Sequence, residues 1–209
     1  MTRFDTWDSY FTDSPRDPRV PEDQRVLRNL IGARTVGELT AEEKRITVFR
    51  VIQIEHGEVT IPGGFDFAHH CAIHAHIFGD VYEWAGQPRT VDMSKTHRLW
   101  PAAGIAAQAA ITYGAISAEN FLRGLDHATF VARLAEHWGE VNVLHSFREG
   151  NTRSQRVFFA LLCAQAGYRL DGAYLEARYD DFLRARESAM LTADSTALAG
   201  FLAGAVQRA

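Results

Sequence analysis

The sequence predicts an all-α fold, a helical bundle that carries one short β-hairpin, and three observations support this class. Apolar residues recur at helical spacing over most of the 209 residues. Capping residues and glycines stand at the ends of these segments. Alternating apolar and polar residues mark residues 88–99 as the hairpin. A chain of this length with 46% hydrophobic residues can bury a substantial core, so we expect a single domain over residues 1–209.

The N-terminal part begins with an irregular arm, residues 1–20, in which Asp, Arg, Pro and Ser are frequent. The aromatic residues of the arm indicate that it docks on the domain, whose core we expect at about residues 40–190. Thr40 to Glu43 has the pattern of a capping box and predicts a helix that ends before Gly57. A second helical stripe follows over residues 66–84.

Further helices are expected in the C-terminal half, separated by turn residues and capping residues. They comprise a helix from Pro101 toward Leu125, a helix that ends at His145, a largely apolar helix from Arg153, a helix from Asp171 to about Ala189, and one from Asp194 or Ser195 onward. The expected total is seven or eight helices.

The segment 145–156, with the sequence HSFREGNTRSQR, joins two of these helices and concentrates groups that handle phosphate. A Gly-Asn turn that enters a helix points several backbone N–H groups at one spot, which favours anions there. Arg153 and Arg156 are three residues apart and so share one face of the first helical turn. Glu149 is placed to hold a divalent cation of the kind that travels with nucleotide phosphates. His145 is of the residue type whose ordinary pKa lies near neutrality, which suits a base acting on a hydroxyl.

The segment resembles the signature of the Fic (filamentation induced by cAMP) domain family, His-x-Phe-x-(Asp/Glu)-Gly-Asn-Gly-Arg-x-x-Arg. The matching positions are His145, Phe147, Glu149, Gly150, Asn151, Arg153 and Arg156. Residues 65–74 and 80–91 are similar to the helix and flap that precede the signature in Fic proteins. The resemblance covers roughly residues 50–170 and implies a Fic-type helical bundle with the hairpin as its flap.

The resemblance implies a protein adenylyltransferase, which moves AMP from ATP to a Ser, Thr or Tyr hydroxyl of a target protein and releases pyrophosphate. His145 would deprotonate that hydroxyl, and Glu149 would hold Mg²⁺. The phosphates of ATP would be bound by the rest of the signature, namely Gly150, Asn151 and Thr152 in the turn and Arg153 and Arg156 at the β- and γ-phosphates. The flap would hold the target segment in extended form by strand addition.

Thr152 departs from the family signature, because it stands where the second glycine is usual. Threonine tolerates neither positive φ nor a close backbone approach as glycine does. In ordinary helical geometry its hydroxyl could donate to a phosphate, whereas a turn that needs bare backbone would displace the α-phosphate. A family branch with lysine at this position acts as a kinase. The alternatives are therefore a phosphotransferase, another nucleotidyltransferase, or a nucleotide-binding module that Thr152 makes inactive.

Fic proteins are restrained by a helix that carries (Ser/Thr)-x-x-x-Glu-(Gly/Asn), whose glutamate pairs with the last arginine of the signature. The sequence contains no such string. The resemblance therefore implies the toxin of a toxin–antitoxin pair, inhibited by a separate small antitoxin protein. Targets of such toxins include the ATPase subunits of bacterial type II topoisomerases.

Composition excludes several other classes of protein. The formal net charge of −4 argues against a general nucleic-acid surface. The sequence has no apolar stretch of membrane-spanning length and no leader pattern, so we expect no membrane contact and a cytoplasmic location. Neither a P-loop nor a Rossmann glycine motif is present. Cys71 and Cys163 lie in apolar segments and are expected to be buried thiols, not a disulfide.

A histidine-rich segment, residues 69–76, offers one competing interpretation. His70 and His74 have the i, i+4 spacing of a zinc-ligand pair. No further acidic or cysteine ligand except Cys71 stands nearby in the sequence, and the resemblance treats this helix as scaffold. We therefore expect these histidines to support the fold.

Overall fold

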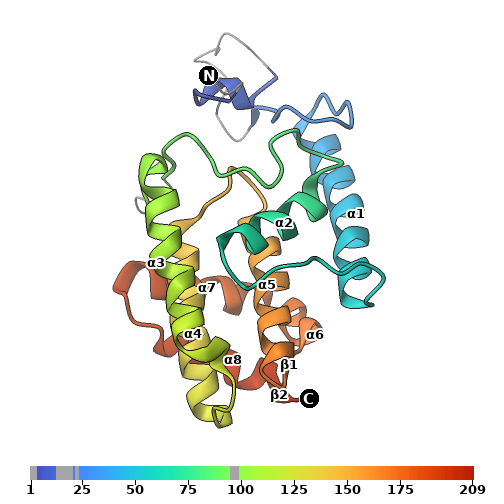
Figure 1. The fold of residues 1–209 in the computed structure, drawn as a ribbon. Helices are drawn as coiled ribbons and strands as arrows, with labels where there is room; N and C mark the ends of the chain where they lie inside the picture. The colour runs from blue at the N-terminus through green and yellow to red at the C-terminus, as the bar shows by residue number, and fades with distance from the viewer. Residues whose placement is uncertain (1–3, 13–20, 22–23, 95–98) are drawn as a thin grey trace.

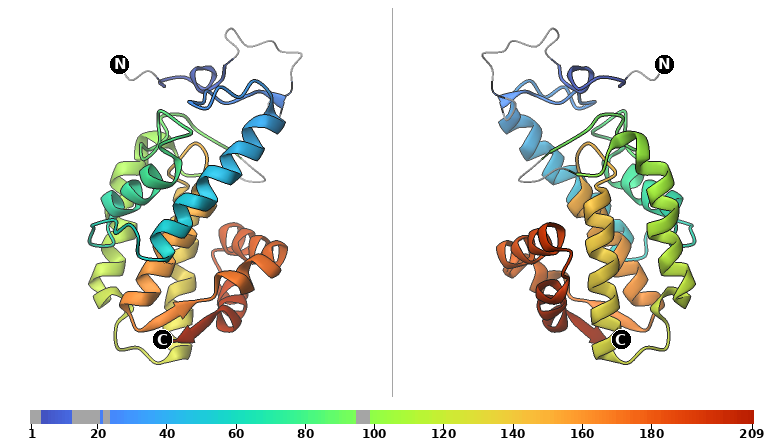
Figure 2. Two further views of the ribbon diagram at one scale, coloured as in Figure 1. Left: turned by 90° about the vertical axis from the view of Figure 1, so that its right-hand side faces the viewer. Right: turned by 90° about the vertical axis from the view of Figure 1, so that its left-hand side faces the viewer.

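The computed structural model describes residues 4–12, 21, 24–94 and 99–209. These residues form eight α-helices in three layers and one small antiparallel sheet (Figures 1 and 2), which confirms the all-α class. The central layer is the antiparallel pair α4 (His127–Leu144) and α5 (Asn151–Gln165).

The outer layers contain three helices each and pack on opposite sides of the central pair (Figure 2). One layer comprises α1 (Val36–Glu55), α2 (Phe67–Phe78) and α3 (Ile105–Ala118). The other comprises α6 (Gly172–Ala177), α7 (Tyr179–Thr192) and α8 (Thr196–Ala205). The sheet pairs β1 (Tyr168–Leu170) with β2 (Val206–Arg208), with Tyr168 opposite Arg208.

The α1 helix begins at a capping box, but not at the predicted one. Thr35 Oγ1 accepts a hydrogen bond from the Glu38 backbone N–H at 3.2 Å, and the Glu38 carboxylate accepts from the Thr35 N–H at 3.2 Å. The capping box expected at Thr40 is wrong because the helix has already begun there and Glu43 is buried in another network.

Several predicted helix ends also shift. The α2 stripe ends at Phe78 instead of residue 84, and the helix predicted over residues 101–125 ends at Ala118. Positive φ angles at the three residues of Asn120–Leu122 break the latter. Arg178 separates α6 from α7 within the single helix that was expected after Asp171.

The predicted hairpin over residues 88–99 is described only in part, because residues 95–98 lie outside the described residues. The Leu99 N–H donates to the Met93 carbonyl at 3.4 Å, which brings the two sides of this segment together. The paired strands of the structure, however, are β1 and β2 near the C-terminus.

The hydrophobic core extends on both sides of the residues 40–190 expected from the sequence. Leu198 and Leu202 of α8 and Val206 of β2 are buried in it, as are Tyr10 and Phe11 of the N-terminal arm. The α8 helix and β2 pack against α4, and the Tyr10 ring contacts Trp84. Both cysteines are free thiols, as predicted, but only Cys163 is buried, whereas Cys71 is partly exposed. Within the described part of the chain, no helix is both long and apolar enough to span a bilayer.

Candidate active site

The loop between α4 and α5 lies at the end of the molecule where the flap and the N-terminal arm pass (Figure 1). His145 ends α4 in the left-handed conformation, with φ 43° and ψ 60°. Its N–H still donates to Val141 O at 3.3 Å, and the residue is 5% exposed. A non-glycine residue in this conformation is strained and persists only where its surroundings hold it. The prediction that α4 delivers His145 at its end is confirmed.

Arg89 keeps His145 in this conformation, because it binds the α4–α5 loop to the flap segment, residues 88–99. Its Nε–H donates to His145 O at 2.8 Å, and its backbone N–H donates to Ser146 O at 2.8 Å. The guanidinium also donates to Val91 O at 2.8 Å and to Trp100 O. Arg89 is 2% exposed, and burial lowers the pKa of its guanidinium. One buried cation therefore fixes the loop and both sides of the flap together.

Asn151 and Gly150 shape the turn by different means. The Asn151 side chain accepts from Phe147 N at 2.9 Å and donates to Phe147 O at 2.7 Å, so its amide braces the loop and does not face a ligand. Gly150 has φ 82°, and a Cβ at this position would lie 2.4 Å from the Phe78 ring. Both the backbone conformation and the space therefore require glycine here.

The N-terminus of α5 has no side chain bound to its first backbone N–H groups. Its N-cap is Gly150, and no side chain caps the helix. The first backbone N–H groups of a helix have no partner within the helix, so they form a site for an anion. Glu149 stands beside this site, with its side chain 45% exposed and Oε1 accepting from Gly150 N at 2.8 Å.

His74 supports the same turn as a neutral ring. Its Nδ1 accepts from the Gly86 N–H at 2.9 Å, so its Nε2 carries the proton and donates to Glu149 O at 2.9 Å. Burial lowers the pKa of His74 to about 4. The ring stacks on Phe147 with centroids 3.9 Å apart.

His70 supports the first turn of α5 through a chain of hydrogen bonds. Ser154 Oγ donates to Asn151 O at 3.3 Å and therefore accepts from His70 Nε2 at 3.0 Å. His70 Nδ1 then accepts from the Tyr113 hydroxyl at 2.5 Å. Burial lowers the pKa of His70 to about 3. Because both ring nitrogens of His70 and His74 bind protein groups, the two histidines act as scaffold.

Arg153 and Arg156 flank the first turns of α5 but contact different helices. Arg153 donates to Thr47 Oγ1 at 2.9 Å and forms an ion pair with Glu43, both on α1. Arg156 pairs at 3.3 Å with Glu176 of α6, whose side chain is 71% exposed. An exposed pair of this kind is weak, so Arg156 can exchange Glu176 for another anion.

Thr152 lies within α5 and is not among the residues with positive φ. The backbone at this position does not need glycine, because Gly150 and not Thr152 takes the left-handed conformation at the start of α5. Thr152 Oγ1 accepts a hydrogen bond from Arg186 of α7 at 3.0 Å.

The N-terminal arm covers the outer side of the loop. The guanidinium carbon of Arg148 lies 4.2 Å from the centroid of the Trp7 ring and 5.2 Å from that of Phe11. The Tyr10 hydroxyl lies 3.2 Å from Thr90 Oγ1 in the flap. The arm therefore contacts both parts of the candidate site.

Three contributing residues were not assigned from the sequence, namely Glu43, Arg89 and Arg186. A pattern could have indicated two of them. Glu43 is in line with Leu39 and Thr47 on the buried face of α1, and Arg186 lies on the stripe formed by Phe182, Ala185 and Ala189. A charged residue on a buried helical stripe must find partners there, but sequence spacing does not name those partners.

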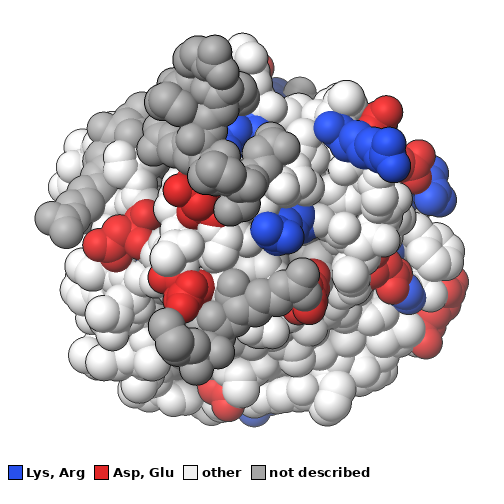
Figure 3. Space-filling view, turned by 90° about the horizontal axis from the view of Figure 1, so that it is seen from above, with Lys and Arg blue, Asp and Glu red and all other residues white. Residues whose placement is uncertain are grey.

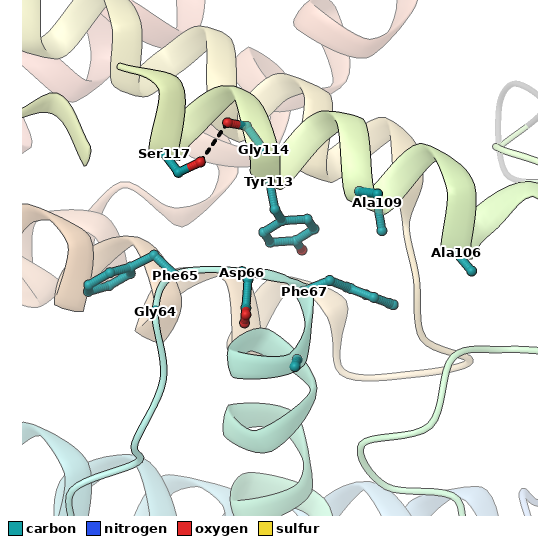
Figure 4. A pocket seen from close by; sticks show the side chains of 11 residues that line it. Gly64, Phe65, Asp66, Phe67, Ala106, Ala109, Tyr113, Gly114 and Ser117 are labelled. Carbon is teal, nitrogen blue, oxygen red and sulfur yellow. Dashed lines mark hydrogen bonds between the residues drawn. The ribbon is translucent and has the colours of Figure 1, made fainter. Parts of the chain in front are cut away.

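A separate hollow of about 310 Å³ lies between α3 and the N-terminus of α2 (Figure 4). Alanines and the aromatic residues Phe65, Phe67 and Tyr113 form much of its lining, and Tyr113 projects from α3 toward α2. The Asp66 carboxylate caps α2 by accepting from His69 N at 2.8 Å. The hollow therefore lacks the cluster of polar groups that surrounds His145.

The surface at the arm end of the molecule carries mixed charge. In Figure 3 the visible basic side chains stand apart from one another in small groups, some of them beside acidic ones, and the described part of this face shows no continuous basic area. Of the arginines around the candidate site, Arg89 and Arg186 are buried, whereas the side chains of Arg153 and Arg156 are partly exposed.

His145 at the end of α4 and the Gly150 turn at the start of α5 belong to the segment that resembles the Fic signature. The model of the Fic/DOC family matches residues 64–163. Protein adenylyltransferase VbhT of Bartonella schoenbuchensis is 37% identical over 156 residues, 74% of this chain and 32% of that protein. Probable protein adenylyltransferase Fic of Salmonella typhimurium is 36% identical over 156 residues, 74% of this chain and 76% of that protein. The chain belongs to the Fic/DOC family, and it spans about a third of the length of VbhT.

Solved structures share the fold. The BepC protein of Bartonella tribocorum with bound AMPPNP aligns with a TM-score of 0.82 at 21% identity, over 91% of this chain and 96% of that chain. A Fic domain of Bartonella quintana with bound ADP aligns with a TM-score of 0.83 at 22% identity, over 95% of this chain and 94% of that chain.

Proposed function

We propose that this chain is a protein adenylyltransferase that moves AMP from ATP to a Ser, Thr or Tyr hydroxyl of a target protein. The observation that carries the proposal is the pairing of His145 with the open N-terminus of α5 across one braced turn. Relatives that are 33–37% identical are named protein adenylyltransferases or probable protein adenylyltransferases, which supports a nucleotidyltransferase activity. The nucleotides bound in the similar Bartonella structures support ATP as the donor.

In the proposed reaction, His145 accepts the proton of the target hydroxyl while the hydroxyl oxygen attacks the α-phosphorus of ATP. The new bond joins that oxygen to the α-phosphorus, and the bond between the α-phosphorus and its bridging oxygen breaks. Pyrophosphate leaves with the electron pair. The N–H groups at the start of α5, with Gly150, Asn151 and Thr152, stabilise the charge that develops on the phosphate oxygens. Arg156 is the better placed of the two signature arginines to bind the outer phosphates, because its present partner is exposed.

The residues around Glu149 fit a magnesium ion that arrives with the nucleotide. Oε1 accepts from the Gly150 N–H, and the side chain is 45% exposed, so the carboxylate is accessible to an ion. Mg²⁺ is commonly held by one or two carboxylates together with substrate phosphates. When bound, the ion would neutralise part of the triphosphate charge. Arg153 would contribute positive potential from its pair with Glu43.

The biological setting is also a proposal. The flap, bound to the loop through Arg89, would hold an extended target segment by strand addition beside His145. The chain would act in the cytoplasm as the toxin of a toxin–antitoxin pair, with an ATPase subunit of a type II topoisomerase as a candidate target. A small antitoxin could inhibit it by placing a glutamate on Arg156, since a carboxylate and a phosphate compete for the same guanidinium.

The rival reactions are phosphate transfer, transfer of another nucleotide, and nucleotide binding without transfer. We would incubate the purified chain and a bacterial lysate with ATP labelled at the α- or the γ-phosphate, using His145→Ala as the control. Label from α-labelled ATP alone, lost in the variant, is the expected result. Label from γ-labelled ATP would indicate a phosphotransferase, and saturable ATP binding with neither label transferred would indicate the inactive module.

A further inference from the structure

Arg186 of α7 is a buried cation directly behind the start of α5. It is 4% exposed, and its Nη1–H donates to Thr152 Oγ1 at 3.0 Å. Its Nη2 donates to Gln155 Oε1 at 2.6 Å and to Asn142 Oδ1. The guanidinium therefore connects α4, α5 and α7 at the one position where the chain departs from the family signature.

The partners of Arg186 carry no charge. Hydroxyl and amide oxygens accept its hydrogen bonds, and no carboxylate among the described residues forms an ion pair with it. Arg153 and Arg156, by contrast, each pair with a glutamate. Burial lowers the pKa of Arg186 to about 10, so the group is still charged at neutral pH. A buried charge without a counter-charge is unfavourable, and an anion bound nearby would relieve it.

The hydrogen bonds also fix what the Thr152 hydroxyl can do. A hydroxyl has one proton to donate and two lone pairs to accept with. Because Arg186 donates to Thr152 Oγ1, the threonine proton stays available, and no described residue accepts it. Asn142 and Gln155 hold the guanidinium in place, so the hydroxyl is held as a donor beside the first N–H groups of α5.

We propose that Arg186 is a positioning residue for the phosphates of the nucleotide and that it acts through Thr152. This inference rests on the proposed function only for the identity of the ligand as a nucleoside triphosphate. Where the family glycine offers bare backbone, this chain offers a hydroxyl donor that a buried arginine orients and polarises. The positive charge of Arg186 adds to the potential at the start of α5, and the bound triphosphate supplies the missing counter-charge.

The test uses Thr152→Val, which keeps the shape of the side chain but removes the hydroxyl, and Thr152→Ser, which keeps the hydroxyl. Thr152→Val should raise the KM for ATP and the Kd for inorganic tripolyphosphate about tenfold, the expected cost of one charge-assisted hydrogen bond. For Thr152→Ser, both the KM for ATP and the Kd for tripolyphosphate should remain within about twofold of wild type. Calorimetry measures the tripolyphosphate Kd without any catalytic turnover.

Arg186→Gln should weaken tripolyphosphate binding by a similar factor, and the double variant Arg186→Gln with Thr152→Val should be little worse than either single variant. Arg184→Gln is the matched control, because Arg184 lies on the same helix with its side chain 70% exposed and paired with Asp181. The affinity of Arg184→Gln for tripolyphosphate should equal that of wild type.

The outcomes separate this inference from the proposed function. Wild-type transfer of AMP together with unchanged tripolyphosphate affinity in Thr152→Val would overturn the role of Arg186 and leave the reaction intact. Loss of affinity in Thr152→Val, with no AMP transfer by wild type, would support the phosphate site and reject the reaction. If Arg186→Gln fails to fold, the comparison of Thr152→Val with Thr152→Ser still decides the question.

Discussion

At the scale of single residues, the backbone of His145 fixes where its ring can act. The left-handed conformation turns the chain sharply at the end of α4, and Arg89 holds the resulting carbonyl at 2.8 Å. A base must be placed within hydrogen-bond reach of the proton that it removes. The surrounding structure therefore controls the position of this strained residue.

His145→Ala should lower the rate of transfer about 10²- to 10⁴-fold and leave ATP affinity within a few-fold of wild type, because the ring acts only on the attacking hydroxyl. Single-turnover rates and equilibrium titration with ATP measure the two quantities separately. A variant that retains more than a tenth of the wild-type rate would remove His145 from the mechanism.

The neutral histidines predict how stability depends on pH. Burial lowers the pKa of His70 to about 3 and that of His74 to about 4, from an ordinary value of 6.5. Below pH 6.5 the unfolded chain therefore binds protons at these two histidines that the folded chain does not bind. The free energy of unfolding contains their whole contribution above pH 6.5 and decreases as the pH falls below this value. Each group contributes up to about 1.4 kcal/mol per pH unit.

Urea unfolding between pH 7 and pH 5 measures this slope. His74→Gln should flatten it, because it removes one of the two strongly shifted rings. A wild-type stability that is constant over this range would contradict the neutral, scaffold role of the two rings.

At the scale of elements, the first turn of α5 is held by side chains from three other helices. Glu43 of α1 binds Arg153, His70 of α2 binds Ser154, and Arg186 of α7 binds Thr152. Arg89 also binds the flap to the loop between α4 and α5. A helix start supported from several sides keeps its N–H groups fixed, which lowers the cost of organising the site when a ligand binds.

Arg89→Lys should lower the free energy of unfolding by about 2–4 kcal/mol, because an ammonium cannot satisfy carbonyls that lie in several directions and some would be left buried without a partner. Arg45→Lys is the control, since the Arg45 side chain is 71% exposed and should tolerate the change. Equal stability of the two variants would show that Arg89 does not bind the flap to the loop.

The sequence was informative about this site where its residues are contiguous. Residues 145–156 revealed the base, the glycine turn and the arginines, because their chemistry depends on short spacing. Arg186 and Glu43 reach the turn only after α7 and α1 have packed against α5, so no local pattern named their partners. The capping box at Thr40 was wrong for a related reason, since Thr35 and Thr40 each stand three residues before a glutamate and the sequence alone does not choose between them.

At the scale of the whole molecule, the site and the C-terminal sheet lie at opposite ends of the bundle (Figure 1). The all-α class and the Fic family were both predictable, because helical spacing and one long motif are strong signals. The core is wider than the residues 40–190 expected, since α8 and β2 contribute buried residues, and the arm docks as its aromatic residues predicted.

Expression of the chain alone should slow bacterial growth, because the proposed toxin would meet its target without its antitoxin. Growth curves with matched expression levels measure the effect, and His145→Ala should restore the normal rate. If wild type and His145→Ala slow growth equally, the effect comes from expression of the protein and not from its activity.

The central claim is that the turn at the start of α5 presents the α-phosphorus of ATP to a hydroxyl deprotonated by His145. The intact mass of a lysate protein modified by this chain tests it most directly. We predict an increase equal to one adenosine monophosphate group on a hydroxyl residue, absent when His145→Ala is used. An increase equal to one phosphate, or unchanged masses throughout a lysate in which the chain binds ATP, would contradict the claim.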